Sequence, residues 1–331
     1  MTIKDLLEKR EADTLSPYAK LSKETAGRDF PLSFDDMRTE FQRDRDRIIH
    51  CKAFRRLMHK TQVFLSPEHD HYRTRLTHTL EVAQIARTVA RSLALNEDLC
   101  EAIALGHDLG HTPFGHAGER VLQRCYDANF DHCKQSLRVV EKLENLNLTH
   151  EVRDGILCHA GEALAKTNEG IIVKFADRIA YINHDIDDAL RAGILKHDDL
   201  PKALTSRLGD THGERIDTMV RSLIRASQDK PVVTMEKDIY DATMELRAFL
   251  FEHVYTNPDA KGEEGRAEAL LEALYHYFIK NPDEMPKEYL PTVVEEGVPR
   301  AVCDYISGMT DRYAINLYKS IFIPRAWGQK G

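Results

Sequence analysis

The sequence predicts an all-α fold, and three observations support that prediction. Apolar residues recur at helical spacing in long segments from residue 34 almost to the end of the chain. Prolines separate these segments after residue 200, as expected where one helix stops before the next begins. Strands do not alternate with helices, so a parallel sheet is not expected. A small β-hairpin near residue 70 is the one exception.

The expected elements follow in this order. Residues 1–33 form an N-terminal arm, in which Pro17, Gly27 and Pro31 occur without clear periodicity. A helix runs from Phe34 to Leu57, and residues 61–66 then pair with residues 71–74 in the hairpin. The strongest helical segments cover residues 80–95, 98–109, 117–126, 135–146, 151–159, 170–190, 215–226, 237–253, 266–278 and 312–323. We expect a core over residues 34–200 and a C-terminal helical region over residues 201–331 packed on it, in a single domain overall.

The composition is that of a globular protein. The chain has 331 residues, of which 42% are hydrophobic and 30% are charged, so disorder is not expected. No run of apolar residues is long enough to cross a bilayer, and the charged N-terminus lacks the apolar stretch of a secretory signal. Six scattered cysteines without a C-x-x-C pair are typical of reduced thiols. These features predict a cytoplasmic protein without a membrane partner.

The charge is negative overall but unevenly distributed. A formal net charge of -8 argues against a dedicated nucleic-acid binder. Arginines and lysines nevertheless crowd the stretch from Arg38 to Lys60, with Asp44 and Asp46 among them. The stretch is either a helix face or subunit contact with ion pairs, or a surface that attracts a polyphosphate or nucleic acid. Sequence alone favours neither interpretation.

Histidines indicate where the chemistry lies. Eleven of the sixteen fall between residues 50 and 159, which is typical of a metal or acid–base site. The dipeptide His-Asp occurs four times, at 69–70, 107–108, 184–185 and 197–198, and only its surroundings distinguish these copies. His107 ends an apolar helical face that contains Leu99 and Ile103, and Asp108 follows at the helix end.

Two further polar residues lie on apolar helical faces. His78 shares a face with Val82 and Ile85, and Asp177 aligns with Val173 and Ala180. Each alone is more readily a hydrogen-bonded core residue or a paired carboxylate. Two histidines and two carboxylates on separate inward faces are better explained together, because burying carboxylates is costly unless they are paired or bind a metal. Such a set suits Mn, Fe, Zn or Mg.

These motifs resemble a known family. Arg75-Leu76-Thr77-His78, His107-Asp108 and Asp177 match the H…HD…D pattern of HD-domain phosphohydrolases. The longer string from His107 to His116, HDLGHTPFGH, is more specific and looks like the deoxyguanosine-triphosphate triphosphohydrolase branch, which is related to the vertebrate SAM-and-HD-domain dNTPases. Residues 41–50, 60–64 and 176–181 also match, and the resemblance covers residues 28–190 densely.

The resemblance implies an HD-domain helical fold and hydrolysis of a deoxynucleoside triphosphate (dNTP) at the α-phosphorus, giving deoxynucleoside and triphosphate. It implies a divalent metal ion held by His78, His107, Asp108 and Asp177. The matching catalytic residues are His111, His116, Glu119 and His132, and the substrate-binding residues are Gln62, Arg75, Arg178, Tyr181 and Asp185. Relatives often have Asp where Glu119 stands and Asn where Cys133 stands. Homo-oligomers and nucleotide activators are also common among them.

The residue chemistry agrees with this interpretation. His116 is a candidate general acid for the 5′-oxygen, and Glu119 one helical turn later would keep it protonated. Thr112-Pro113 predicts a helix start that suits phosphate. Arg75 and Arg178 can spread charge over phosphate oxygens. Tyr181 either packs on deoxyribose and excludes a 2′-hydroxyl or simply packs in the core.

Two alternatives stay open. An HD-type nucleotidase or cyclic-nucleotide phosphodiesterase would use the same four ligands, although the extension to His116 and the Gln62 segment favour the triphosphohydrolase. A nucleotide-sensing or nucleic-acid-binding regulator is kept possible by the basic stretch, but the ligand and catalytic positions all carry chemically competent residues. Binding of nucleic acid is therefore possible but not required.

Overall fold

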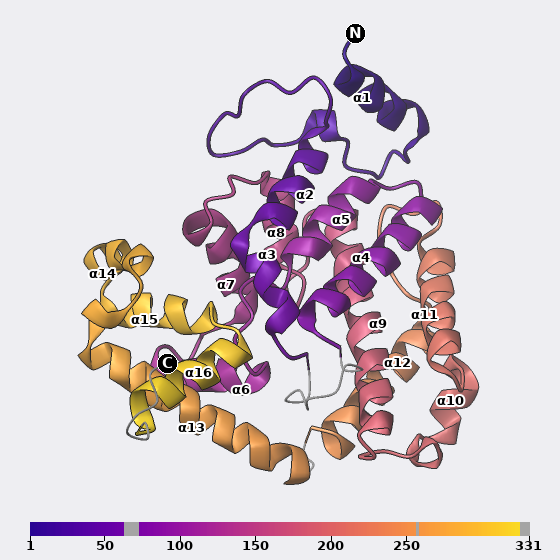
Figure 1. The fold of residues 1–331 in the computed structure, drawn as a ribbon. Helices are drawn as coiled ribbons and strands as arrows, with labels where there is room; N and C mark the ends of the chain where they lie inside the picture. The colour runs from indigo at the N-terminus through magenta and orange to yellow at the C-terminus, as the bar shows by residue number, and fades with distance from the viewer. Residues whose placement is uncertain (63–72, 256–257, 325–331) are drawn as a thin grey trace.

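The structure is a computed structural model that describes residues 1–62, 73–255 and 258–324, and for residues 258–262 only the backbone. Over these ranges it confirms the all-α prediction with sixteen α-helices (Figure 1). The β pairing in the described part of the chain is a single antiparallel bridge between Thr61 and Thr74. Most of the predicted hairpin lies outside the described residues. Within the same ranges, no helix is both long and apolar enough to cross a membrane.

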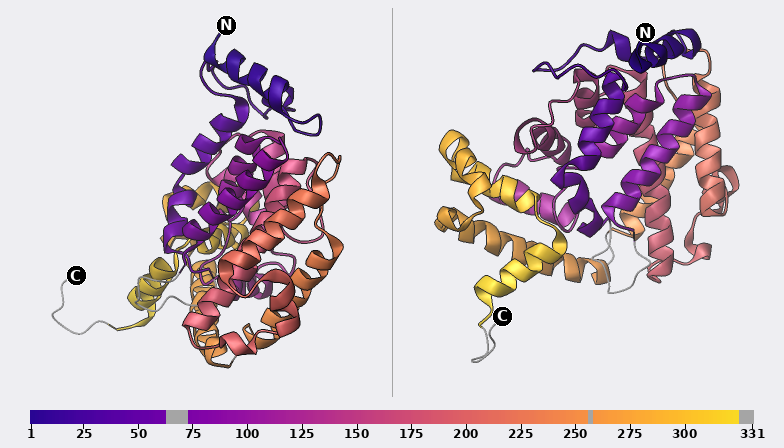
Figure 2. Two further views of the ribbon diagram at one scale, coloured as in Figure 1. Left: turned by 90° about the vertical axis from the view of Figure 1, so that its right-hand side faces the viewer. Right: turned by 45° about the horizontal axis from the view of Figure 1, so that its top comes forward.

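The N-terminal region is more helical than its sequence indicated. Helix α1 (Ile3–Thr14) begins with a capping box in which Thr2 and Asp5 each bond the other's main-chain N–H. It has no buried residue, so it lacks the apolar stripe by which a helix is recognised in sequence. A short 3₁₀ helix, η1 (Ser22–Glu24), follows. Helix α1 lies at the opposite end of the molecule from α16 (Figure 2).

The helix expected over residues 34–57 is shorter and broken, so that prediction was wrong in its extent. Helix α2 (Glu40–His50) starts only after the capping residue Thr39. Cys51 then adopts an extended conformation, and its sulfur accepts a hydrogen bond from the N–H of Phe54 at the start of α3 (Lys52–Arg56). A side-chain cap in mid-segment therefore ends one helix and begins the next.

The larger group of buried apolar side chains, the first cluster, lies between residues 41 and 254. Helices α4 (Arg75–Ser92), α5 (Glu97–Gly106) and α9 (Asn168–Arg191) pack on one another at its centre. Helices α2 and α8 (His150–Leu157) contact α5. Helices α10 (Lys202–Leu208), α11 (His212–Ser227) and α12 (Lys237–His253) complete the cluster beside α9, on the right of Figure 1.

A second cluster of buried side chains joins two distant parts of the chain. Residues 114–130, which include α6 (His116–Cys125), pack with residues 267–314. The C-terminal partners are α13 (Pro258–Lys280), α15 (Val298–Ser307) and α16 (Asp311–Phe322), with α14 (Leu290–Glu296) against α15, at the lower left of Figure 1. Helix α6 therefore belongs by packing with the C-terminal helices and not with its neighbours in sequence.

The remaining elements are short. Helix α7 (His132–Arg138) ends in a π-helical turn, η3 (Val139–Leu143), which stops the helix expected to reach residue 146. The other single turns are η2 (Leu57–His59), η4 (His197–Asp199), η5 (Pro282–Glu284) and η6 (Lys287–Tyr289).

Candidate metal centre and catalytic cluster

The four predicted metal ligands come from three separate segments and meet inside the first cluster. His78 lies in the first turn of α4, which the Thr74 side chain caps, and His107 is the C-cap of α5 with Asp108 after it. Asp177 lies mid-way along α9. His78, His107 and Asp108 are at most 3% exposed. The structure thus brings residues 30 to 100 positions apart into one buried site.

The ligand atoms face one another at short range. His78 Nε2 lies 3.0 Å from Asp177 Oδ1. His107 Nε2 lies 3.6 Å from Asp108 Oδ2 and 3.8 Å from Asp177 Oδ1. The potential ligand atoms of His78, His107 and Asp108 all lie within 4.8 Å of one another. Two imidazoles and two carboxylates therefore surround one small space.

The hydrogen bonds of His107 fit a bound cation. Its Nδ1 lies 2.6 Å from the main-chain carbonyl of Ala104, so we assign the ring hydrogen to Nδ1. Its Nε2 then carries a lone pair, and this buried atom has no hydrogen-bond partner in the part of the chain that the structure describes. A lone pair that faces two carboxylates is unfavourable unless a cation lies among them. The donor set therefore fits a divalent metal ion such as Mn, Fe, Zn or Mg.

His78 shows the same arrangement through a longer chain of contacts. Its Nδ1 lies 3.3 Å from Nδ1 of His184, and Nε2 of His184 lies 3.0 Å from a carboxylate oxygen of Glu81. Burial lowers the pKa of His184 to about 4, so this ring is neutral near pH 7. A neutral His184 that donates from Nε2 to Glu81 accepts a hydrogen bond at Nδ1 from Nδ1 of His78. The hydrogen of the His78 ring then lies on Nδ1, and its Nε2 carries the lone pair that can bind a metal.

Sequence reasoning missed this role of His184. The residue belongs to one of the His-Asp dipeptides, at 184–185, but the dipeptide at 107–108 had the clearer apolar context. The available signal was spacing: His184 lies seven residues after Asp177, two helical turns along the same face of α9.

Arg75 lies directly beside the ligands. Its guanidinium donates to Asp108 Oδ2 at 2.7 Å and to the main-chain carbonyl of Gln62 at 3.4 Å, and the residue is 3% exposed. Burial opposes ionisation of Asp108, but the neighbouring His107 and Arg75 outweigh it and hold the pKa of this carboxyl well below its usual range. Asp108 is therefore an ionised, acceptor-only group.

The four predicted catalytic residues form a second group next to the first. The rings of His111 and His132 stack with centroids 4.7 Å apart, and those of His111 and His116 lie 5.7 Å apart. Glu119 links the other two histidines: its carboxylate lies 3.3 Å from His116 Nδ1 and 3.2 Å from His132 Nδ1. The His116 side chain is 71% exposed, so it can reach a bound molecule.

The stacked histidines have opposite charge preferences. Burial and the charge of Arg75 lower the pKa of His111 well below its usual value. Burial also opposes the charged form of His132, but its contacts with Cys133 and Glu119 outweigh this and raise its pKa. Burial likewise opposes ionisation of Glu119, yet hydrogen bonds from His116 and His132 lower its pKa. A neutral and a charged imidazole therefore lie side by side.

The helix start predicted at Thr112-Pro113 was wrong. Helix α6 begins at His116, and residues 112–115 form a turn in which the Thr112 hydroxyl donates to the carbonyl of Gly115 at 2.8 Å. Phe114 and Gly115 have positive φ angles of 59° and 58°, which a helix does not allow. The polar side chain thus closes a turn instead of capping a helix.

Three predicted substrate residues lie on α9 after Asp177. Tyr181 accepts a hydrogen bond from Arg247 Nε at 2.7 Å. Asp185 is buried and accepts from the Tyr255 hydroxyl, while its Oδ1 has no hydrogen-bond partner within the described ranges, and burial raises the pKa of Asp185 to about 7. Arg247 and Tyr255, from α12 and the turn after it, were not foreseen. Nothing in their sequence context distinguishes them.

The other two predicted substrate residues, Arg178 and Gln62, make different contacts. Arg178 points to the ring of Tyr240, with 6.0 Å between its Cζ and the ring centroid. Gln62 has a buried side-chain oxygen without a hydrogen-bond partner among the described residues, an acceptor that a ligand donor would satisfy. The structure therefore places Arg178, Tyr181 and Asp185 on the helix that carries Asp177, with Arg178 and Asp185 two helical turns apart on one side of α9.

Two further groups border the site. The ring of His159 lies 4.9 Å from that of His107 and 5.3 Å from that of His132. The sulfur of Cys133 lies 3.6 Å from His132 Nε2 and 3.8 Å from His159 Nε2. His159, whose Nδ1 faces the carbonyl of Ile156 at 2.7 Å, fills the space behind the ligands.

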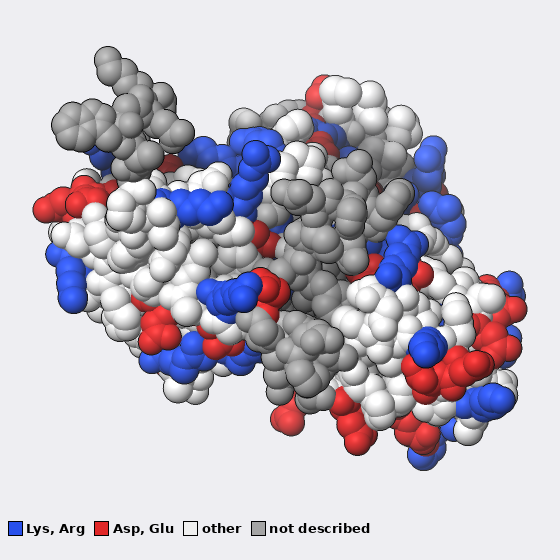
Figure 3. All heavy atoms as spheres, turned by 60° about the horizontal axis from the view of Figure 1, so that its bottom comes forward, with Lys and Arg blue, Asp and Glu red and all other residues white. Residues whose placement is uncertain are grey.

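The basic stretch from Arg38 to Lys60 is largely neutralised by neighbouring carboxylates. Arg38 pairs with Asp35 and Asp46, and Arg45 pairs with Asp46, Asp98 and Glu101. Because these ion pairs use the basic side chains, the ion-pair interpretation describes this stretch better than a polyphosphate-binding surface does. Figure 3 draws the face at the bottom of Figure 1, where basic and acidic side chains are also interspersed over the described surface.

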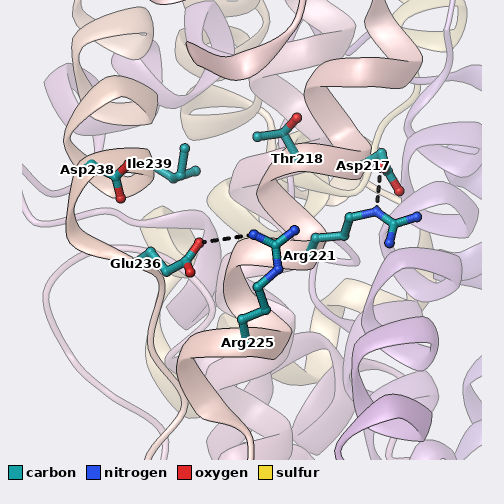
Figure 4. A pocket seen from close by; sticks show the side chains of 7 residues that line it. All are labelled: Asp217, Thr218, Arg221, Arg225, Glu236, Asp238 and Ile239. Atoms are coloured by element: carbon teal, nitrogen blue, oxygen red, sulfur yellow. Dashed lines mark hydrogen bonds and ion pairs between the residues drawn. The ribbon is translucent and has the colours of Figure 1, made fainter.

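A surface hollow of about 560 Å³ lies on α11 and the start of α12, away from the histidines (Figure 4). Its two arginines are held by carboxylates of the same wall: Arg221 lies 2.6 Å from Asp217, and Arg225 lies 3.9 Å from Glu236. The hollow contains none of the predicted site residues.

Comparison with known proteins gives the family. Residues 75–182 match the model of the HD domain, and residues 233–320 match that of a phosphohydrolase-associated domain. A "deoxyguanosinetriphosphate triphosphohydrolase-like protein" from Caldanaerobacter subterraneus subsp. tengcongensis is 60% identical, over 99% of this chain and 98% of its own. The chain belongs to this triphosphohydrolase-like family.

Other members are nearly as well covered. The family protein from Clostridium perfringens is 49% identical over 98% of this chain and 99% of its own, and that from Geobacter sulfurreducens is 40% identical over 95% and 96%. A solved structure of a hypothetical protein from Aquifex aeolicus has 19% identity and a TM-score of 0.47, covering 86% of this chain and 69% of that one, which is too low to support an argument. The chain is thus an HD-domain phosphohydrolase, and its His–Asp cluster offers the ligands for the divalent metal that HD domains bind.

Proposed function

We propose that this triphosphohydrolase-like protein hydrolyses deoxynucleoside triphosphates, dGTP or several dNTPs, at the α-phosphorus to give deoxynucleoside and intact triphosphate. One observation supports this above all: a cluster of two histidines and two carboxylates, in which His107 Nε2 has no hydrogen-bond partner among the described residues, lies beside an exposed histidine that is bonded to a buried glutamate. The first group suits a phosphate and the second suits proton delivery to a leaving oxygen.

His78, His107, Asp108 and Asp177 would hold the metal, with His184 and Glu81 fixing the tautomer of His78. A bound divalent ion polarises a phosphoryl oxygen and helps to orient the attacking water. Arg75, held against Asp108, is in place to donate to a non-bridging phosphate oxygen. Ligand donors would satisfy the free oxygens of Gln62 and Asp185.

Proton delivery falls to His116. A water molecule attacks the α-phosphorus, the bond to the 5′-oxygen breaks, and His116 gives that oxygen the proton it needs to leave as a deoxynucleoside hydroxyl. Glu119 orients His116 through its Nδ1 and is itself held by the N–H and Nδ1 of His132. The water's proton passes to solvent, because the lowered pKa of His111 makes that imidazole a weak base, and His111 would instead orient the water.

Product analysis tests this function. The purified protein is incubated with Mn²⁺ or Mg²⁺ and, separately, with each dNTP, with deoxynucleoside monophosphates and with cyclic nucleotides. Triphosphate as the inorganic product from a dNTP, lost after chelation of the metal, is the expected result. Orthophosphate from monophosphates, or hydrolysis of cyclic nucleotides alone, would identify the nucleotidase or phosphodiesterase instead. Retention on single-stranded DNA without any hydrolysis would favour the regulator.

A further inference from the structure

A buried lysine connects the catalytic turn to the C-terminal helices. The Lys60 side chain is 2% exposed, and its ammonium group donates to the main-chain carbonyl of His111 and, at 2.8 Å, to that of Ser307 at the end of α15. Burial lowers the pKa of Lys60 to about 7, so charging this amine in the interior is unfavourable without such acceptors. One side chain thereby joins three separate segments.

Asp311, the first residue of α16, makes a second connection between the same regions. Its Oδ1 accepts the N–H of Phe114 at 2.9 Å. Its Oδ2 accepts the N–H of Thr61 at 2.9 Å and also the Thr61 hydroxyl. Both carboxylate oxygens are therefore used, one on the turn after His111 and one on the segment that leads to Gln62.

The turn that these residues hold is conformationally demanding. Phe114 adopts a positive φ that bulky residues rarely adopt, and Gly115 does the same beside the carbonyl of Gln62. The turn also packs against α6 so closely that a Cβ on Gly118 would lie 2.2 Å from the carbonyl oxygen of Pro113. A turn of this kind persists only where its surroundings fix it.

We propose that Lys60 and Asp311 form a clamp by which the C-terminal helices fix the turn between His111 and His116, and that both are positioning residues for the reaction. This proposal rests on the proposed function in one respect, because the proposed function gives His111 and His116 their catalytic roles. It assigns the C-terminal region a role in the active centre: the region supplies the acceptors that set the distance between the two histidines.

The variant Asp311→Asn tests the clamp, because an amide has one acceptor oxygen where the carboxylate has two. Asp44→Asn is a matched control. Asp44 is fully buried, and one of its oxygens accepts the N–H and hydroxyl of Thr149 at 2.9 and 2.6 Å, as Asp311 does with Thr61. Asp44 lies in α2, its other oxygen accepts from Arg28, and within the described part of the chain it makes no hydrogen bond or ion pair with the turn.

Hydrogen–deuterium exchange of peptides covering residues 111–116 is the first readout, since it needs no turnover. We expect exchange of the Phe114 amide to rise about tenfold or more in Asp311→Asn and not in Asp44→Asn. We expect kcat for dGTP to fall about tenfold or more, while KM and Mn²⁺ affinity change less than about twofold. Equal exchange in the two variants, or unchanged exchange in Asp311→Asn, would overturn the clamp.

Lys60→Met keeps the test decisive if Asp311→Asn does not fold. Its control is Lys174→Met, since Lys174 is also buried and donates to two main-chain carbonyls, those of Gly161 and Ala163. Faster exchange over residues 111–116 in Lys60→Met alone supports the clamp, and equal exchange contradicts it. A wild-type protein without dNTP hydrolysis would refute the proposed function, whereas the exchange result would still decide the clamp.

Discussion

The metal cluster and the catalytic turn lie side by side but are held in different ways. The metal ligands are fixed by residues of the α4, α5 and α9 region: His107 by the carbonyl of Ala104, Asp108 by Arg75, and His78 by His184. The turn before His116 is fixed from afar, with Asp311 lying 197 positions from Phe114 and 250 from Thr61. We therefore expect metal binding to depend on the first cluster of buried side chains, and the proposed proton delivery by His116 to depend also on the second.

This difference predicts that metal binding and proton delivery can be separated by mutation. Changes within the first cluster should remove metal binding and hydrolysis together. Changes around α6 should reduce the rate and leave the metal in place. The following variants test this separation, from the largest expected effect to the smallest.

Asp177→Ala should abolish both metal binding and hydrolysis. It removes the carboxylate that faces His78 and His107, so the two imidazoles lose the anion that offsets the charge of a cation. We expect hydrolysis to fall by at least about a thousandfold and Mn²⁺ binding, followed by calorimetry, to be lost. Asp217→Ala, an exposed carboxylate paired with Arg221, is the control and should bind the metal normally. A fully active Asp177→Ala protein would refute the site.

Glu119→Gln should separate metal binding from proton delivery. The amide cannot bond His116 and His132 as the carboxylate does, so we expect kcat to fall roughly 100-fold while Mn²⁺ affinity stays within about twofold. Loss of the negative charge should also lower the pKa of His132, measured by NMR titration of the imidazole. A parallel loss of metal affinity would show that the two groups are not separable.

His184→Ala should weaken metal binding, although His184 is not one of the four predicted ligands. Without His184, the hydrogen on Nδ1 of His78 has lost its acceptor, and the ring is free to rotate or change tautomer. We expect Mn²⁺ affinity to fall roughly 10- to 100-fold, with recovery of activity at high Mn²⁺ concentration. Glu81→Gln, which keeps an acceptor oxygen, should cost less than His184→Ala. An unchanged affinity in His184→Ala would remove His184 from the metal centre.

Arg45→Ala should have the smallest effect. Arg45 forms partly exposed ion pairs with Asp98 and Glu101 on α5, and such pairs contribute at most about 1 kcal/mol to the free energy of unfolding. We expect thermal denaturation to shift slightly and KM for dGTP to stay within about twofold. A large rise in KM, or loss of a salt-dependent retention on single-stranded DNA, would instead give the basic stretch a binding role.

The same difference explains how far the sequence could be interpreted. Helical periodicity predicted the all-α class and placed His78, His107 and Asp177 on inward faces, because each face is read within a few turns of one helix. The resemblance, and not periodicity, singled out Glu119 and His132. The structure brings the predicted ligands together, and separately groups the predicted catalytic residues.

What escaped prediction depends on contacts that have no local pattern. Helix α1 has no buried face, and the break at Cys51 comes from a side-chain cap inside a segment that otherwise reads as one helix. The turn at Thr112 looked like a helix start because Thr-Pro is common there, whereas distant partners decide its conformation. Tyr255 and Arg247 contact Asp185 and Tyr181 only after α12 has packed on α9.

The packing of α6 with the last helices has a consequence for biosynthesis. Residues 114–130 leave the ribosome well before residues 267–314, with which their apolar side chains are buried. At ~5–20 residues per second, these side chains wait roughly 10 to 40 s for their partners. A nascent chain in this interval can already bring the predicted metal ligands together, but the turn before the proposed proton donor, His116, still lacks its C-terminal partners, so we expect hydrolysis only after residues 267–314 have been made.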